Sequence, residues 1–116
     1  SLPRTDIIYT HCDDDGILIE AAVNTGAQGI IYAGSGMGSI HCGAENALLK
    51  AVQQGVAVVR STRVSEGRVL AANPKWDEAG FICGGNLNPQ KARILLQLAL
   101  TCTHDTRKIQ EFFDKY

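Results

Sequence analysis

Residues 29–39, GIIYAGSGMGS, decide the fold that we expect for this chain of 116 residues. The first six residues form an apolar run that is typical of a buried strand, and the glycines that follow predict a turn. Residues 56–61, VAVVRS, form a second such run, apolar on both faces as central strands of parallel sheets are. Between the two runs, residues 44–54 carry apolar side chains at helical spacing, and Gly55 follows as a helix stop. The order strand, helix, strand predicts a parallel pair of strands.

The rest of the chain continues this alternation. Further strands are predicted at residues 6–10 and 81–83, and further helices at residues 17–23, 88–100 and 105–116. We therefore expect an α/β fold of the three-layer α/β/α type, a four-stranded parallel sheet flanked by about four helices. The whole chain, residues 1–116, is expected to form a single domain, because domains of ~100–150 residues are common.

Capping residues predict where several helices begin and end. Asn88 followed by Pro89 is a typical helix start, because Asn caps the helix and Pro fits its first position. Gly26 is expected to end the helix that begins near Ile17. One of the three aspartates at 13–15 is expected to cap that same helix, and their charges favour its positive N-terminal end.

The composition restricts the class of partner. Eleven basic and twelve acidic residues give a net charge of −1, without the basic excess of nucleic-acid-binding proteins. The apolar runs are shorter than the ~20 residues of a membrane-spanning helix. We therefore expect no nucleic-acid partner and no membrane partner. The chain begins with Ser and not with Met, which leaves room for an upstream segment.

The cysteines leave several interpretations open. The four cysteines show no C-x-x-C spacing and are too few for a disulfide scaffold. Cys83 and Cys102 lie in apolar runs, so we expect both to be small buried side chains.

Two identical dipeptides, His11-Cys12 and His41-Cys42, each follow a predicted strand. Two His and two Cys are a possible zinc ligand set, and Cys12 and Cys42 are a possible disulfide. Adjacent residues at a strand end point in opposite directions, however, which favours unpaired side chains.

Ligands of parallel α/β folds bind where the strands end, which makes the loops 11–16, 34–42 and 61–80 the candidate site. The glycine-rich loop does not fit a dinucleotide motif, because the third glycine of G-x-G-x-x-G falls on Ser39. Ser39 adds a hydroxyl that donates and accepts hydrogen bonds. No serine lies in a G-x-S-x-G elbow, and His104 is expected at the opposite edge of the sheet. The chain therefore offers no self-contained catalytic set.

Charged residues near the strand ends favour structural roles. The aspartates at 13–15 suggest a phosphate-accepting receiver domain, but such a domain needs a further Asp after its third strand, where Arg60 and Ser61 stand. Arg60, Arg63 and Arg68 could clamp a carboxylate, but pairing with acids of the same loop is the favoured interpretation.

Four segments carry a resemblance to a known family: residues 29–39, residues 56–64 (VAVVRSTRV), residues 87–101 (LNPQKARILLQLALT) and residues 109–116 (IQEFFDKY). In this order they resemble the C-terminal domain of bacterial, type II-like L-asparaginases of the asparaginase/glutaminase amidohydrolase family. The resemblance covers nearly the whole chain, and the LNPQKAR run is its most specific part.

The resemblance implies a small domain of the flavodoxin- or Rossmann-like kind that works beside a larger N-terminal domain. The larger domain carries the threonine nucleophile, and nothing in this chain matches its motifs. The expected activity of the intact protein is hydrolysis of L-asparagine to L-aspartate and ammonia, without a metal or organic cofactor. The isolated domain is expected to be inactive. Its implied partners are its own N-terminal domain and further copies of itself, in a homodimer and homotetramer.

The resemblance also implies two substrate-binding positions that act on the active site of a neighbouring subunit. Ser39 stands where family members have Asn or Ser after the glycine-rich turn. The second position, a carboxylate in the loop after the third strand, falls near Asn73, where this sequence has no acid. Met37 stands where many members have Asn.

Two alternatives remain beside this interpretation. One is a free-standing ligand-binding or interaction module without catalysis, and the weaker one is a metal-binding domain built on His11, Cys12, His41 and Cys42. The resemblance suggests a periplasmic or secreted protein and leaves a cytoplasmic one possible.

Overall fold

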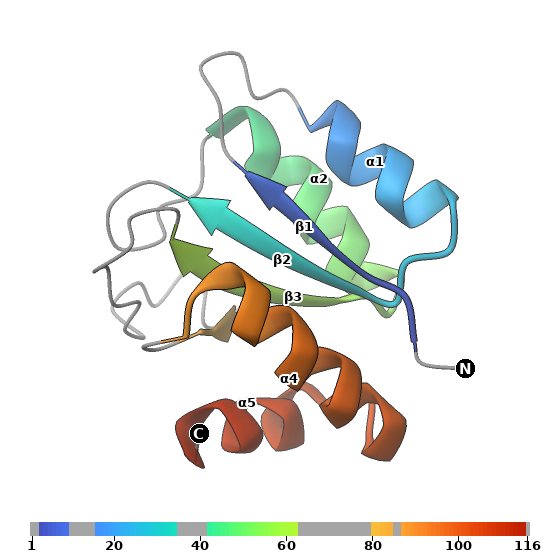
Figure 1. The fold of residues 1–116 in the computed structure, drawn as a ribbon. Coiled ribbons are helices and arrows are strands. Elements are labelled where there is room, and N and C mark those ends of the chain that lie inside the picture. Colours follow the sequence, from blue (N-terminus) through green and yellow to red (C-terminus); the bar gives the residue numbers. More distant parts are fainter. Residues whose placement is uncertain (1–2, 10–15, 35–41, 63–79, 85–86, 116) are drawn as a thin grey trace.

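The computed structural model describes residues 3–9, 16–34, 42–62, 80–84 and 87–115, and confirms the predicted α/β fold. Its strands form one parallel sheet in the order β1-β2-β3-β4 (Figure 1). The strands are β1 (Thr5–Tyr9), β2 (Gly29–Gly34), β3 (Ala57–Thr62) and β4 (Ile82–Cys83). The helices are α1 (Ile17–Asn24), α2 (Cys42–Gln53), α4 (Pro89–Cys102) and α5 (Thr106–Lys115). The predicted elements are all present, with ends shifted by a few residues at most.

Helices cover both faces of the sheet and enclose two apolar cores. Figure 1 shows α1 and α2 on one face and α4 and α5 on the other. Side chains alternate along each strand, so Ile30 and Val58 point to the α1–α2 face while Ile31 and Val59 point to the α4–α5 face. All four are completely buried. Because both faces of the central strands are covered, both must be apolar, as their sequences are.

The helix ends follow the sequence in most places. Gly26 and Gly55 adopt positive φ angles of 95° and 90° two residues after the ends of α1 and α2, as expected of helix stops. Asn88 caps α4, with its Oδ1 accepting a hydrogen bond of 2.9 Å from the Lys91 N–H, and Pro89 is the first helical residue. At α1 the prediction is wrong: Gly16, at φ 84°, occupies the N-cap position that we expected an aspartate to hold. The aspartates at 13–15 lie outside the described residues.

The two cysteines that the structure describes fully differ from each other. Cys83 is buried in β4, as predicted, whereas Cys102 is exposed at the end of α4. The prediction for Cys102 was wrong because α4 buries Ala99 and Leu100 near its end, whereas Cys102, its last residue, faces solvent. Within the described ranges, no helix is both long and apolar enough to cross a membrane.

Candidate functional site

The candidate site lies at the edge of the sheet where its strands end. Because the strands are parallel, the last residues of β1, β2 and β3 lie side by side: Tyr9 pairs with Ala33, and Gly34 pairs with Thr62. Gly34 and Thr62, the last residues before the segments that contain Ser39 and Asn73, are therefore neighbours in the sheet. Ser39 and Asn73 themselves lie outside the described residues, and their role in substrate binding stays a prediction.

Buried polar residues of β3 support this edge. Arg60 is 2% exposed and lies opposite Tyr32 of β2, which is completely buried. Ser61 is also completely buried, and its Oγ donates a hydrogen bond of 3.5 Å to the carbonyl of Leu87, just before α4. Burial of Arg60 agrees with a structural role and leaves it inaccessible to a ligand from solvent. The acids proposed as partners for these arginines lie outside the described residues, as do Arg63 and Arg68.

Gly84 closes the same edge at the end of β4. Its N–H donates a 2.9 Å hydrogen bond to the Arg60 carbonyl, which extends the pairing of β3 with β4 by one residue. A Cβ at this position would lie 2.7 Å from that carbonyl oxygen. This contact is too short, and the oxygen belongs to the backbone, which cannot move aside as a flexible side chain could. The glycine is therefore required by the close approach of two strands.

The start of α4 completes the described part of the edge. Tyr9 at the end of β1 is 43% exposed, and its hydroxyl accepts a 3.1 Å hydrogen bond from Nε2 of Gln90 in the first turn of α4. The N-terminus of α4 thus lies beside the strand ends from which the candidate loops leave. A helix N-terminus contributes positive potential to its surroundings, which favours the carboxylate of an amino-acid ligand.

Other predicted residues are not brought to this edge. His104 lies within 3.4 Å of Oε1 of Gln28, which precedes β2, so His104 sits at the opposite edge of the sheet, as the sequence predicted. Among the described residues, no group of three or more His, Cys, Asp and Glu could hold a metal ion. His11, Cys12 and His41 lie outside those residues, as does the Cys42 side chain, so the zinc and disulfide interpretations stay untested.

The geometry defines a class: a small parallel α/β domain that presents loops at the carboxyl edge of its sheet. A family model of the Glutaminase/Asparaginase C-terminal domain matches residues 4–113, and the chain belongs to this family. The resemblance inferred from the sequence is thereby confirmed.

Individual relatives agree with the family and show how much of them this chain spans. It is 50% identical to L-asparaginase 2 of Bacillus subtilis, over 99% of the chain and 30% of that protein. It is 43% identical to the probable periplasmic L-asparaginase of Haemophilus influenzae, over 100% of the chain and 34% of that protein. The crystal structure of a probable cytoplasmic L-asparaginase from Campylobacter jejuni superposes with a TM-score of 0.94 at 47% identity, covering 100% of this chain and 38% of that one. The chain spans about a third of the length of its curated relatives.

Proposed function

We propose that this chain is the C-terminal domain of an L-asparaginase, an amidohydrolase that converts L-asparagine to L-aspartate and ammonia. The observation that carries the proposal is the 50% identity along 99% of the chain to a protein named L-asparaginase 2. The threonine nucleophile belongs to the N-terminal domain, so this chain binds and orients substrate and performs no bond cleavage itself.

Within this function, Ser39 orients the substrate in the active site of a neighbouring subunit. Ser39 follows β2 at the carboxyl edge of the sheet. The consecutive residues Arg60 and Ser61 are buried at this edge, and α4 begins beside it. A hydroxyl suits this task, because it can accept from the substrate ammonium or donate to the substrate carboxylate. Asn73, from the adjacent loop after β3, is proposed as the second contact.

Kinetics of the intact enzyme test the assignment of Ser39. Loss of a hydrogen bond to a charged group costs about 1.5–3 kcal/mol, so Ser39→Ala should raise KM for asparagine by roughly 10–150-fold with a smaller change in kcat. Ser39→Asn should retain low KM, because the amide also donates and accepts. Thr106→Ala, an exposed position at the start of α5, is the matched control and should leave KM unchanged.

The kinetic results test two assignments separately: the role of Ser39 in substrate binding and the activity of the intact protein. An unchanged KM in Ser39→Ala removes Ser39 from the site but leaves the enzyme assignment intact. An intact protein that releases no ammonia from asparagine overturns the assignment, and a ligand-binding module then takes its place. Asn73→Ala should raise KM less than Ser39→Ala, since the family places a carboxylate there and Asn73 lacks its charge.

The 116-residue chain alone should release no ammonia from asparagine. Its relatives are named after both the periplasm and the cytoplasm, so we propose no single compartment. We propose that each active site lies at a subunit interface, between the N-terminal domain of one subunit and the C-terminal domain of its neighbour.

A further inference from the structure

Two side chains of α4 hold the segment by which the chain enters the domain, residues 3–5, hereafter the entry segment. Gln97 donates through Nε2 to the Pro3 carbonyl at 3.2 Å, and Arg93 donates through Nε to the Thr5 carbonyl at 2.8 Å. The two donors are four residues apart on one flank of the helix, about 6 Å along its axis. The two carbonyls are two residues apart, about 6.6 Å in an extended chain. Because the spacings match, α4 and the entry segment run antiparallel and are bonded at two successive points.

Arg4, in the middle of the entry segment, bonds to two further elements. Its carbonyl accepts hydrogen bonds from the N–H groups of Gln28 and Gly29 at 2.8 and 3.2 Å, where β2 begins. Its guanidinium donates at 3.1 Å to the carbonyl of Thr25, the C-cap of α1, and pairs with Asp6 at 3.2 Å. A cation is favoured there, because the C-terminus of a helix carries partial negative charge. The entry segment is therefore bonded to α1, to the start of β2 and to α4.

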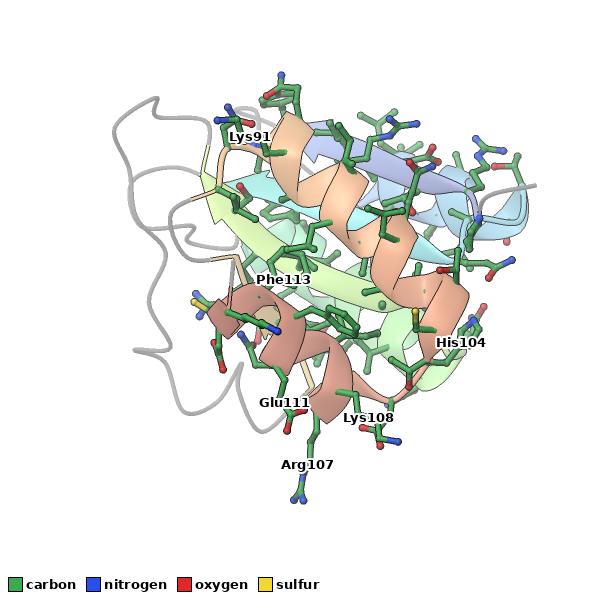
Figure 2. The ribbon with its side chains drawn as sticks, turned by 60° about the horizontal axis from the view of Figure 1, so that its bottom comes forward. Lys91, His104, Arg107, Lys108, Glu111 and Phe113 are labelled. Carbon is green, nitrogen blue, oxygen red and sulfur yellow. The ribbon has the colours of Figure 1, made fainter. Side chains whose placement is uncertain are left out.

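The entry segment lies at the end of the sheet opposite the candidate site. The chain enters at the end away from the strand arrowheads (Figure 1), and α4 runs from Lys91, beside the strand ends, to His104, beside the strand starts (Figure 2). Because β1 spans five residues, about 16 Å separate its two ends. The side chains that hold the entry segment therefore do not touch a ligand at the candidate site.

Such bonding at every carbonyl is more than a connection between domains needs. The first residues of a domain are poorly ordered unless they are tied down, and segments between domains are commonly flexible. Here the ring of Pro3 fixes its own φ at about −65°, and the hydrogen bonds hold the three carbonyls that follow from Pro3 to Thr5. The main chain therefore leaves the domain in one direction.

We propose that the entry segment is a rigid joint, which fixes the direction in which the preceding part of the intact protein meets this domain. Arg4, Arg93 and Gln97 are then positioning residues, which touch no substrate and act by holding the whole domain in place. The inference rests on the proposed function, because it requires an N-terminal domain before Pro3. A loose joint would let this domain sample many orientations, and ordering them on substrate binding would cost affinity.

Trypsin cleavage of the intact protein tests the joint directly, because Arg4 is itself a cleavage site. Proteases cut main chain that opens locally, at a rate set by how often it opens. The α4 double variant, Arg93→Met with Gln97→Leu, removes both donors and should be cut after Arg4 about tenfold faster than the unchanged protein. Mass spectrometry of the new N-terminus measures this rate. The control variant, Arg107→Met with Gln53→Leu, makes the same changes at exposed helix positions and should be cut at the unchanged rate. Equal cleavage of the two variants overturns the proposal.

Kinetics of asparagine hydrolysis show whether the joint positions the domain. The α4 double variant should raise KM for asparagine about threefold or more with little change in kcat, because this domain binds substrate and cleaves no bond. A variant that is only destabilised loses folded enzyme, which lowers the apparent kcat and leaves KM unchanged. The control variant should keep both constants. An unchanged KM in the α4 double variant overturns the positioning role.

Cleavage needs no activity, so the two measurements separate the joint from the proposed function. If only the α4 double variant is cut faster while the unchanged protein releases no ammonia from asparagine, the proposed function fails and the joint stands. If asparagine is hydrolysed while both variants are cut at the rate of the unchanged protein, the joint fails and the proposed function stands.

Discussion

The two edge strands of the sheet, β1 and β4, are stabilised in different ways. β1 pairs with β2 over five register positions, from Thr5 to Tyr9. β4 pairs with β3 over only two register positions, at Ile82 and Cys83, with one further bond from the Gly84 N–H. Side chains from α4 and α5 form hydrogen bonds with the main chain at both edges. The shorter strand has fewer ladder hydrogen bonds, so it depends more on the side chain that reaches it.

At β4, the amide of Gln110 binds both main-chain groups of Cys83. Its Oε1 accepts from the Cys83 N–H at 2.8 Å, and its Nε2 donates to the Cys83 carbonyl at 3.2 Å. A neighbouring strand would make the same pair of bonds, so Gln110 of α5 takes the place of a further strand. At β1, Arg93 reaches only a carbonyl, that of Thr5. A two-residue edge strand is thus stable when a helix supplies the missing peptide-like partner, and this partner also protects the edge from pairing with other chains.

Among these substitutions, removing the Gln110 amide should lower the free energy of unfolding most. Gln110→Ala takes two hydrogen-bond partners from partly buried main-chain groups, which should lower the free energy of unfolding by about 2 kcal/mol. Urea denaturation measures the loss, and hydrogen exchange of the Cys83 amide shows where it arises. Glu111→Ala, the exposed neighbour on α5, is the control and should have little effect. Equal losses in the two variants would mean that β4 does not depend on Gln110.

The hydrogen bond from Arg93 to β1 should contribute less to the free energy of unfolding than the two bonds of Gln110. Arg93→Met keeps the aliphatic part of the side chain but removes the charged donor to the Thr5 carbonyl, so we expect a loss of about 1.5 kcal/mol, the lower end for a bond to a charged group, because this bond is only partly buried. Hydrogen exchange should increase at the start of β1 and stay unchanged in β4. Arg107→Met, at an exposed position of α5, controls for the loss of a positive charge. A larger effect at Arg93 than at Gln110 would reverse the comparison between the two edges.

Much of this architecture could be predicted because it depends on local patterns. The runs at 29–34 and 56–61 are apolar on both faces, so both faces of these strands must be shielded from water. This requirement predicts helices on either side of a parallel sheet. Asn88-Pro89, Gly26 and Gly55 act within one turn of their own helices, so the sequence was enough to place them.

The edge contacts could not be predicted, because they join residues that are distant in the sequence. Gln110 and Cys83 are separated by 27 positions, and nothing in a glutamine at helical spacing indicates that its amide pairs with a strand. The exposure of Cys102 depends on which side of the last turn of α4 faces the core, and there Ala99 and Leu100 are buried. For the candidate site, the residues alone offered a hydroxyl after a glycine-rich turn, and only the family resemblance gave Ser39 and Asn73 their proposed roles.

The N-cap of α4 provides the smallest and most specific test of the comparison. Asn88→Ala removes the acceptor of the Lys91 N–H and should cost about 1 kcal/mol, whereas Asn88→Asp keeps an acceptor and should cost less. The first turn of α4 bonds to Tyr9 through Gln90, so fraying there should increase hydrogen exchange near the end of β1. The Cys83 amide should keep its protection, because Gln110 holds it from α5. If Asn88→Ala loosened β4 as much as β1, the two edges would unfold as one unit and would not be stabilised separately by α4 and α5.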